Sequence, residues 1–333
     1  MRISTHPLGL IRAANAAAYL RGFACSGIAT ILITRALLAQ AGYPKVGSGK
    51  LHIAHALWGG LLMAAGVGVA VVFLGRSARL WAAITGGVGF GLFIDEIGKL
   101  VDQTGYFYRP AAGLIYLTFV GLVLISQWVG ARAPLSPRER TANAASAALA
   151  GVTSGLTPQE RRAAVRLVAD LDGEVPEALR RLLDAVPERR PYASKPVRTA
   201  AARVRVLAGR LASRRIVLDV AVLYLVAQGA LTLAGVLADD VLSTHPAERE
   251  TGAVVAVACC AVVSTALSGY GVLRLARDRP TAFRMCNVAV LLDILVGQVF
   301  KFTINQFAAL SGLAMDLLVA WIIAIESRRL RTP

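Results

Sequence analysis

The sequence is short of the residues on which many secreted and metal-binding proteins depend. Its 333 residues include only four cysteines and four histidines. Cys25, Cys259, Cys260 and Cys286 show neither the paired spacing of a zinc site nor the pattern of a secreted disulfide framework. All four fall inside apolar segments, where we interpret them as small apolar side chains. Residues 1–22 lack the apolar core and small-residue cleavage site of a signal peptide, so we expect no cleaved signal.

Acidic residues are also few. The chain has 20 Asp and Glu against 36 Lys and Arg, which gives a formal net charge of +16. In a soluble protein this excess would point to nucleic acid. Here the arginines lie between apolar runs, without interleaved aromatic residues or a recognised nucleic-acid-binding fold, and we expect no nucleic-acid partner.

Long apolar runs are abundant. Hydrophobic residues make up 56% of the chain, and several runs reach about 20 residues, the length an α-helix needs to cross a bilayer. We predict an all-α polytopic membrane helix bundle with about eight transmembrane helices in two four-helix blocks and a cytoplasmic helical insert. The blocks are expected at 1–131 and 216–333, with a basic linker at 132–215. The expected spans are 18–40, 51–74, 79–101, 110–131, 216–238, 252–275, 282–304 and 308–326.

The distribution of arginine predicts an orientation. The connections at 75–79 and 274–280, the linker and the C-terminal tail carry most of the Arg, whereas the alternate loops are poorer in basic residues or acidic. The positive-inside rule then places both termini and the linker in the cytoplasm of a multi-pass protein of the plasma (cell inner) membrane.

The linker 132–215 is basic, with 17 Lys and Arg against 8 Asp and Glu. Thr157, followed by Pro158 and by Glu160 three residues on, has the pattern of a capping box at the start of a helix. We expect short amphipathic helices whose basic face rests on anionic lipids of the inner leaflet. Binding of a cytosolic protein is the alternative.

A polar cluster is expected at the outer ends of the first three spans. His52 and His55 lie one helical turn apart where the second span begins. Asp95 and Lys99 share one stripe near the end of the third span. Because these helix ends lie at the same membrane face, one depth should collect six ionisable side chains, namely Arg35, His52, His55, Asp95, Glu96 and Lys99.

Glycines favour close packing of the second and third spans. Gly59 and Gly60 lie in the second span, and Gly87 and Gly91 have small-xxx-small spacing in the third. Such packing would bring the two histidines within reach of Asp95 or Glu96.

Three interpretations of this outer cluster remain open. It is a neutralised structural network, in which Asp95 pairs with Lys99 and Arg35 pairs with Glu96. It is a polar vestibule for a transported ion or small solute. Or it is a divalent metal site, with zinc the natural ion, in which His52, His55, Asp95 and Glu96 are ligands.

Ionisable residues also occur inside the last two spans. Asp293 and Asp316 fall near mid-membrane by residue count, where an unpaired carboxylate would cost several kcal/mol. We therefore expect both to face the bundle interior, either in helix packing or as proton or cation carriers. Lys301 lies near the outer end of its span.

Three segments together resemble a known sequence signature. They are "HIAHALWGG" (52–60), "GFGLFIDEIGK" (89–99) and "YFYRP" (106–110). The pattern resembles an uncharacterised family of multi-pass membrane proteins from actinobacteria, and enrichment in alanine and arginine over lysine suits such a genome. The resemblance covers about residues 18–130 and implies no established activity.

The pattern favours a permease or channel-like transporter for a small polar or ionic substrate. The outer cluster would admit the substrate, and Asp293, Lys301 and Asp316 would extend the polar route. One alternative is an intramembrane metal-dependent hydrolase acting on a lipid headgroup, with Asp95 or Glu96 as general base. Another is a non-catalytic assembly or sensor protein that uses the linker.

Overall fold

The fold is a helical membrane bundle. The computed structural model describes residues 10–40, 55–100, 109–131, 134–189, 203, 215–242, 251–275, 277–304 and 306–329. Over these ranges the regular secondary structure is helical throughout, without a β-strand. Seven of the described helices are apolar and long enough to cross a membrane. The predicted all-α polytopic membrane bundle is therefore confirmed.

The observed helices follow the expected spans closely. The second expected span appears as α2, whose 18 residues rise about 27 Å, close to the thickness of a bilayer's hydrocarbon core. The span expected at 282–304 contains three consecutive helical elements. The helices at the eight expected positions, of which α2 is shorter than the seven candidate spans, are α1 (Ala16–Gln40), α2 (His55–Val72), α3 (Arg76–Leu100), α4 (Arg109–Ala131), α9 (Arg215–Leu242), α10 (Thr251–Arg274), α11 (Arg279–Leu292) with η2 (Asp293–Gly297) and α12 (Gln298–Ile304), and α13 (Gln306–Arg329).

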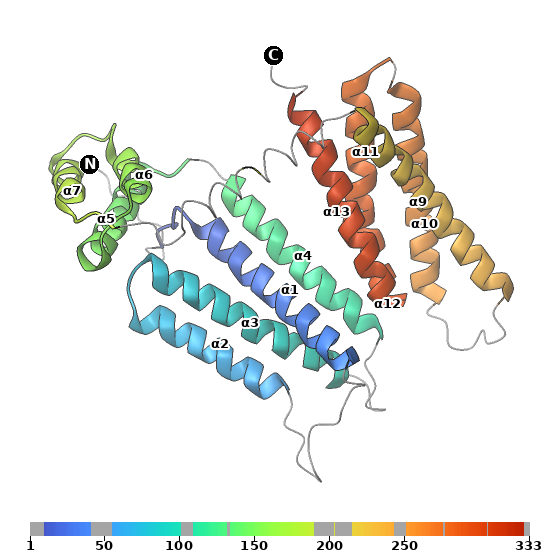
Figure 1. Ribbon diagram of the computed structural model, residues 1–333, viewed down its shortest axis with the longest axis horizontal. Coiled ribbons are helices and arrows are strands. Elements are labelled where there is room, and N and C mark those ends of the chain that lie inside the picture. Colours follow the sequence, from blue (N-terminus) through green and yellow to red (C-terminus); the bar gives the residue numbers. More distant parts are fainter. Residues whose placement is uncertain are drawn as a thin grey trace, which may run out of the picture. The chain divides into compact units, whose positions relative to one another are not determined.

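The described helices form two compact units. The first contains α1, α2, α3 as far as Ile97, the part of α4 from Phe119 onward, and three shorter helices that follow α4 (Figure 1). The second contains the earlier part of α4 and α9 to α13. The predicted division of the chain at 131/132 and 215/216 stays a prediction.

In the first unit, glycine lets α2 approach α3 closely. A Cβ atom at Gly59 would lie 2.7 Å from the carbonyl oxygen of Gly89, and one at Gly89 would lie 2.6 Å from that of Gly59. Gly66 on α2 also lies close to α3, where a Cβ atom would lie 3.0 Å from the Ala82 carbonyl oxygen and 3.0 Å from the Gly86 backbone nitrogen. The predicted packing of the second and third spans is confirmed, because only glycine fits at these backbone contacts.

The glycines named from the sequence do not all serve this contact. Gly87 and Gly91 lie against α1, where a Cβ at Gly91 would lie 2.5 Å from the Gly27 carbonyl oxygen. Gly60 has no neighbouring atom within 4 Å of a built Cβ. The helix α3 therefore uses two glycine faces, one toward α2 and the other toward α1.

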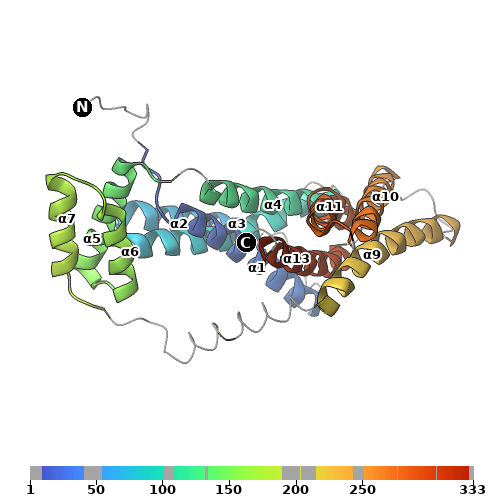
Figure 2. The ribbon, with the colours of Figure 1, turned by 90° about the horizontal axis from the view of Figure 1, so that it is seen from above.

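Three helices between residues 137 and 185 form a small bundle of their own (Figures 1 and 2). They are α5 (Pro137–Ser154), α6 (Pro158–Val168) and α7 (Glu174–Ala185). Ala148, Leu156, Leu183 and Val186 form its core with Ala164. The short amphipathic helices expected in the linker are thus confirmed for this segment, whereas most of 190–214 lies outside the described residues.

The capping box read from the sequence is present at the start of α6. The Thr157 hydroxyl accepts a hydrogen bond from the Glu160 backbone N–H, and the Glu160 side chain accepts one from the Thr157 N–H. A second capping box, formed by Ser136 and Glu139, begins α5. Each box satisfies backbone donors that a helix start leaves without partners.

The helical bundle α5–α7 is bonded to the chain just before α1. The Asn143 side chain accepts a hydrogen bond from the Ala14 backbone N–H at 2.7 Å and donates one to the Arg12 carbonyl at 2.9 Å. Arg76, at the start of α3, lies 3.8 Å from Glu160. These contacts join α5–α7 to the residues just before α1 and to the start of α3. We predict that both of these helix ends lie on the cytoplasmic side.

In the second unit, the core lies between α9, α11 and α13. It contains Leu225 and Val222 of α9, Cys286 and Val290 of α11, and Ile323 of α13. Glycine again allows close approach, because a Cβ at Gly271 of α10 would lie 2.8 Å from the Cys286 sulfur. The buried thiol confirms the interpretation of Cys286 as an apolar filler.

Candidate functional site

The outer cluster is described only in part. His52 lies outside the described residues, and the side chains of His55 and Lys99 do so as well, although their backbones belong to α2 and α3. Asp95 and Glu96 are buried, with 3% and 4% of their surface exposed. The predicted convergence of all six side chains therefore stays a prediction.

One ion pair of the outer cluster joins α1 to α3. Arg35 on α1 donates from Nε to Asp95 Oδ1 on α3 at 2.6 Å. One of the three interpretations of the outer cluster pairs Arg35 with Glu96 and Asp95 with Lys99, and these two pairings stay predictions. The Arg35–Asp95 pair depends on how α1 and α3 are rotated about their axes, which the spacing within one helix does not determine.

The described residues provide no support for the metal hypothesis. Among the side chains that the structure describes, no group of three or more His, Cys, Asp or Glu could hold a metal ion. The proposed ligand set includes His52 and His55, whose side chains are not described, and it stays a prediction. Asp95 already accepts a charged hydrogen bond from Arg35.

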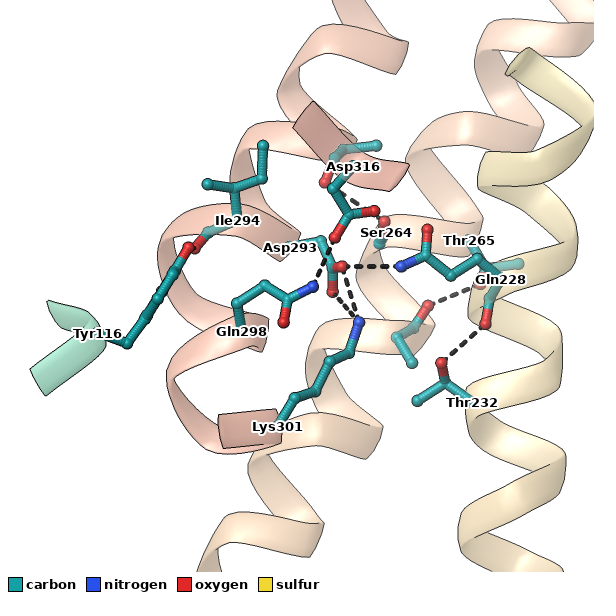
Figure 3. Close-up of polar contacts among 12 residues, drawn as sticks. Tyr116, Gln228, Thr232, Ser264, Thr265, Asp293, Ile294, Gln298, Lys301 and Asp316 are labelled. Atoms are coloured by element: carbon teal, nitrogen blue, oxygen red, sulfur yellow. Dashed lines mark hydrogen bonds and ion pairs between the residues drawn. The ribbon is translucent and has the colours of Figure 1, made fainter. Parts of the chain in front are cut away.

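A second polar cluster is fully described inside the second unit (Figure 3). Its charged members are Asp293 on η2, Lys301 on α12 and Asp316 on α13. Asp293 and Asp316 have 6% and 0% of their surface exposed, which confirms that they face the bundle interior. We call these three residues, together with Gln228 and Gln298, the inner cluster.

Asp293 is paired with Lys301. The Lys301 ammonium lies 2.9 Å from Oδ1 and 2.7 Å from Oδ2 of Asp293. The Gln228 amide on α9 donates to Oδ2 of the same carboxylate at 3.1 Å. The carboxylate of Asp293 is thus neutralised by one cation and solvated by one amide, which offsets the cost of burying it.

A π-helical turn explains why residues eight apart in sequence can pair. On an unbroken α-helix, positions eight apart are separated by about 80° around the axis. The π turn Asp293–Gly297 adds one residue to a helical turn, so Asp293 and Lys301 approach the relation of positions seven apart, about 20°. The lysine side chain extends toward the N-terminal end of its helix and reaches the carboxylate.

Neighbouring groups accommodate the π turn. The Tyr116 hydroxyl on α4 donates to the carbonyl oxygen of Ile294, within the turn, at 2.6 Å. The Tyr116 ring stacks on Phe302 with centroids 4.8 Å apart. A Cβ at Gly297 would overlap the Asp293 carboxylate, so glycine provides the space that this carboxylate occupies.

Asp316 has a different environment from Asp293. Its Oδ2 accepts a hydrogen bond from the Gln298 amide nitrogen at 2.7 Å. Its Oδ1 and the Gln298 Oε1 are both buried and have no hydrogen-bond partner within the described ranges. With both carboxylates ionised, Asp293, Lys301 and Asp316 would carry one net negative charge in an apolar interior.

Sequence reasoning identified the charged members of the inner cluster but missed one neutral member, Gln228, and the neighbouring Tyr116. Gln228 is a single amide within the apolar run of α9, and Tyr116 lies about two turns into α4. An amide inside a transmembrane helix is itself a signal for interhelical hydrogen bonding. The contact of Tyr116 with Ile294 had no such signal, because the accepting carbonyl belongs to a π turn.

Comparisons of the chain with protein-family models, curated proteins and solved structures gave no match. The class of the protein follows from its helices: it is a multi-pass integral membrane protein with bilayer-spanning apolar segments.

Proposed function

We propose that the protein is a permease or channel-like transporter for a small polar or ionic substrate, and that the inner cluster lies on its path. Ionisable residues are rare at the centre of membrane helices, and in transport proteins they mark substrate and ion routes. Asp293 and Asp316 lie well inside the apolar spans 279–304 and 309–326. The inner cluster has the chemistry of such a route.

The observation that carries the proposal is the state of Asp316. Its side chain is completely buried, Oδ1 has no donor among the described groups, and its carboxyl group lies within hydrogen-bonding range of the Asp293 carboxyl group. A structural carboxylate in helix packing would have its lone pairs satisfied, because an unsatisfied buried acceptor costs about 1–3 kcal/mol. An acceptor kept open in the membrane interior favours a transient cationic or hydrogen-bonding occupant.

The π turn supports the same conclusion. Such turns are rare within α-helices and occur frequently at functional sites. Here the turn contains Asp293 and directly precedes Gln298, so it positions two members of the inner cluster. Breaks in helices at membrane depth are tolerated where neighbouring groups satisfy the freed backbone, as Tyr116 does for Ile294.

The proposed location is the plasma membrane, with both termini and α5–α7 in the cytoplasm. The support is the excess of arginine in the linker and C-terminal tail compared with the alternate loops. The outer cluster of Arg35, Asp95, Glu96, His52, His55 and Lys99 would then face the exterior.

Release from proteoliposomes tests transport directly. Vesicles containing the purified protein are loaded with radioactive sodium, rubidium and chloride and a defined mixture of amino acids and sugars. We expect at least one solute to be lost faster than from protein-free vesicles. The Asp293→Asn variant should abolish this release, because it removes the charge that holds Lys301.

The control is Asp219→Asn, which removes an exposed carboxylate from α9 of the same unit. This variant should release solute as the wild type does. Helical circular dichroism and gel filtration establish that each variant is folded, and Lys301→Gln replaces Asp293→Asn where the latter aggregates. Equal retention of every probe by wild-type, variant and protein-free vesicles would overturn the proposed function.

A further inference from the structure

We propose that Asp316 binds an exchangeable proton, so that the ion used by this transporter is a proton held at Asp316 Oδ1. The inference rests on the proposed function for its role in transport, but the proton site itself can be tested without any transport measurement. It follows from the charge balance, the hydrogen bonds and the ligand geometry of the inner cluster.

The charges of the inner cluster require one more positive charge. Asp293 is balanced by Lys301, whose ammonium contacts both of its carboxylate oxygens. Asp316 accepts one hydrogen bond from the neutral amide of Gln298, and its carboxyl group also lies within hydrogen-bonding range of the Asp293 carboxyl group. An ionised carboxylate with a single neutral donor and no exposed surface is expensive in an apolar interior, whereas the protonated acid is neutral.

The unpartnered oxygen of Asp316, Oδ1, suits a proton better than a metal cation. Hard cations such as Mg²⁺ and Ca²⁺ take about six or more oxygen ligands. Among the described atoms of the inner cluster, the unpartnered oxygens are Asp316 Oδ1 and Gln298 Oε1. Two oxygens do not make a coordination shell, and the Lys301 ammonium adds repulsion toward a metal, whereas a proton needs one lone pair.

The groups around Asp316 determine when the proton leaves. The titratable side chains that face it are Asp293 on η2, Lys301 on α12, Tyr224 on α9 and Tyr116 on α4. The helix α11 contributes the Cys286 thiol to the adjoining apolar core, and Cys260 on α10 faces Asp293 and Lys301. Lys301 is thus the one cation among the described groups that both carboxylates share.

Release of the proton from Asp316 changes the contact between Lys301 and Asp293. When the O–H bond of Asp316 breaks and the proton passes to water, the carboxylate that remains attracts Lys301. The ammonium is then shared between two carboxylates, and its contact with Asp293 weakens. Rebinding of the proton returns Lys301 to Asp293. Proton exchange at Asp316 therefore controls the ion pair that spans η2 and α12.

Infrared titration of the reconstituted protein tests the site itself. A protonated carboxylic acid in an apolar environment has a carbonyl band that its carboxylate lacks. We expect the wild type to show such a band, to lose it reversibly as the pH rises, and the Asp316→Asn variant to lack it at all pH values. The Asp219→Asn control should retain it, and Asp316→Glu, which keeps an acid, should show it at a changed frequency.

The coupling is tested in the same vesicles with a pH-sensitive dye trapped inside. An imposed pH gradient should accelerate solute release by the wild type and leave release by Asp316→Asn unchanged. Absence of a titrating carboxylic band that depends on residue 316 would overturn the proton site, even if solutes are released. A titrating band without release of any probe would overturn the proposed function and leave the proton site standing.

Discussion

The hydroxyl of Tyr116 on α4 donates to the carbonyl oxygen of Ile294 at 2.6 Å, and this bond ties a separate span to the π turn of the inner cluster. The carbonyl lies in a turn whose backbone does not follow the ordinary α-helical pattern. Tyr116 therefore gives this carbonyl a hydrogen-bond donor from outside the helix.

Removing this hydroxyl should destabilise the second unit. We expect Tyr116→Phe to lower the free energy of unfolding by about 1 kcal/mol, because the buried Ile294 carbonyl loses its donor while the ring stacking on Phe302 is kept. The measurement is thermal unfolding in detergent. Tyr270→Phe, at an exposed tyrosine on α10, is the matched control and should change stability little. Equal effects of the two substitutions would contradict the assigned role.

The Asp293–Lys301 pair should show strong energetic coupling. We expect Lys301→Met alone to cost about 3–5 kcal/mol, because it leaves the buried Asp293 carboxylate without its cation. The double variant Asp293→Leu with Lys301→Met should cost less than the two single changes added together. Denaturant titration of all four proteins measures the coupling, and additive losses would show that the pair contributes nothing.

Glycine at position 59 should be essential for the contact of α2 with α3. We expect Gly59→Ala to cost about 1–3 kcal/mol, because its methyl group would meet the Phe93 and Gly89 backbones at 2.6 and 2.7 Å. Gly60→Ala, at the next position and facing open space, should be neutral or slightly stabilising. Thermal unfolding of both variants gives the comparison, and a neutral Gly59→Ala would refute the close approach.

The helical bundle α5–α7 should lose stability in acid through Glu160. Burial tends to raise the pKa of Glu160, but hydrogen bonds from Thr157 and the charges of Arg189 and Arg76 outweigh it, so its pKa lies below the ordinary 4.5. A depressed carboxyl pKa contributes stability that is present above 4.5 and is lost as the pH falls through the folded-state value. We expect protection from hydrogen exchange in α6 to fall in that acidic window.

The control for this prediction uses two glutamates. Glu160→Gln should reduce the acid-dependent part of the loss, since glutamine does not titrate. Glu174→Gln, at an exposed acid in the first turn of α7, should leave the pH profile of α6 as in the wild type. Exchange is carried out on the full-length protein, and mass spectrometry of peptides from α6 after digestion, corrected for the intrinsic pH dependence of exchange, measures both variants. A profile unchanged by Glu160→Gln would assign the acid sensitivity elsewhere.

Much of the fold could be predicted because it depends on properties that are local in sequence. Apolar length determined the spans, so that α1 (Ala16–Gln40) lies within two residues of the expected 18–40. The capping box at Thr157 and Glu160 was readable because its two partners are three residues apart. Burial of Asp293 and Asp316 followed from the cost of exposing a carboxylate to lipid.

The parts that could not be predicted depend on how one helix is rotated against another. Arg35 bonds Asp95 across two helices, and no spacing within either helix specifies that partner. Lys301 reaches Asp293 because of a π turn, and the sequence "DILVG" has no feature that distinguishes it from α-helix. The sequence likewise does not show which glycine faces a neighbouring helix. Gly59 and Gly60 are adjacent, and only Gly59 meets a neighbouring backbone.

The π turn gives the inner cluster an unusual mechanical property. If its hydrogen bonds returned to the α-helical register, every residue beyond it would turn by about 100° about the helix axis. Lys301 would then lie about 80° from Asp293 around the axis, compared with about 20° when the π turn is present. A shift of a few backbone hydrogen bonds is thus enough to separate Lys301 from Asp293, without any tilting of whole helices in the bilayer.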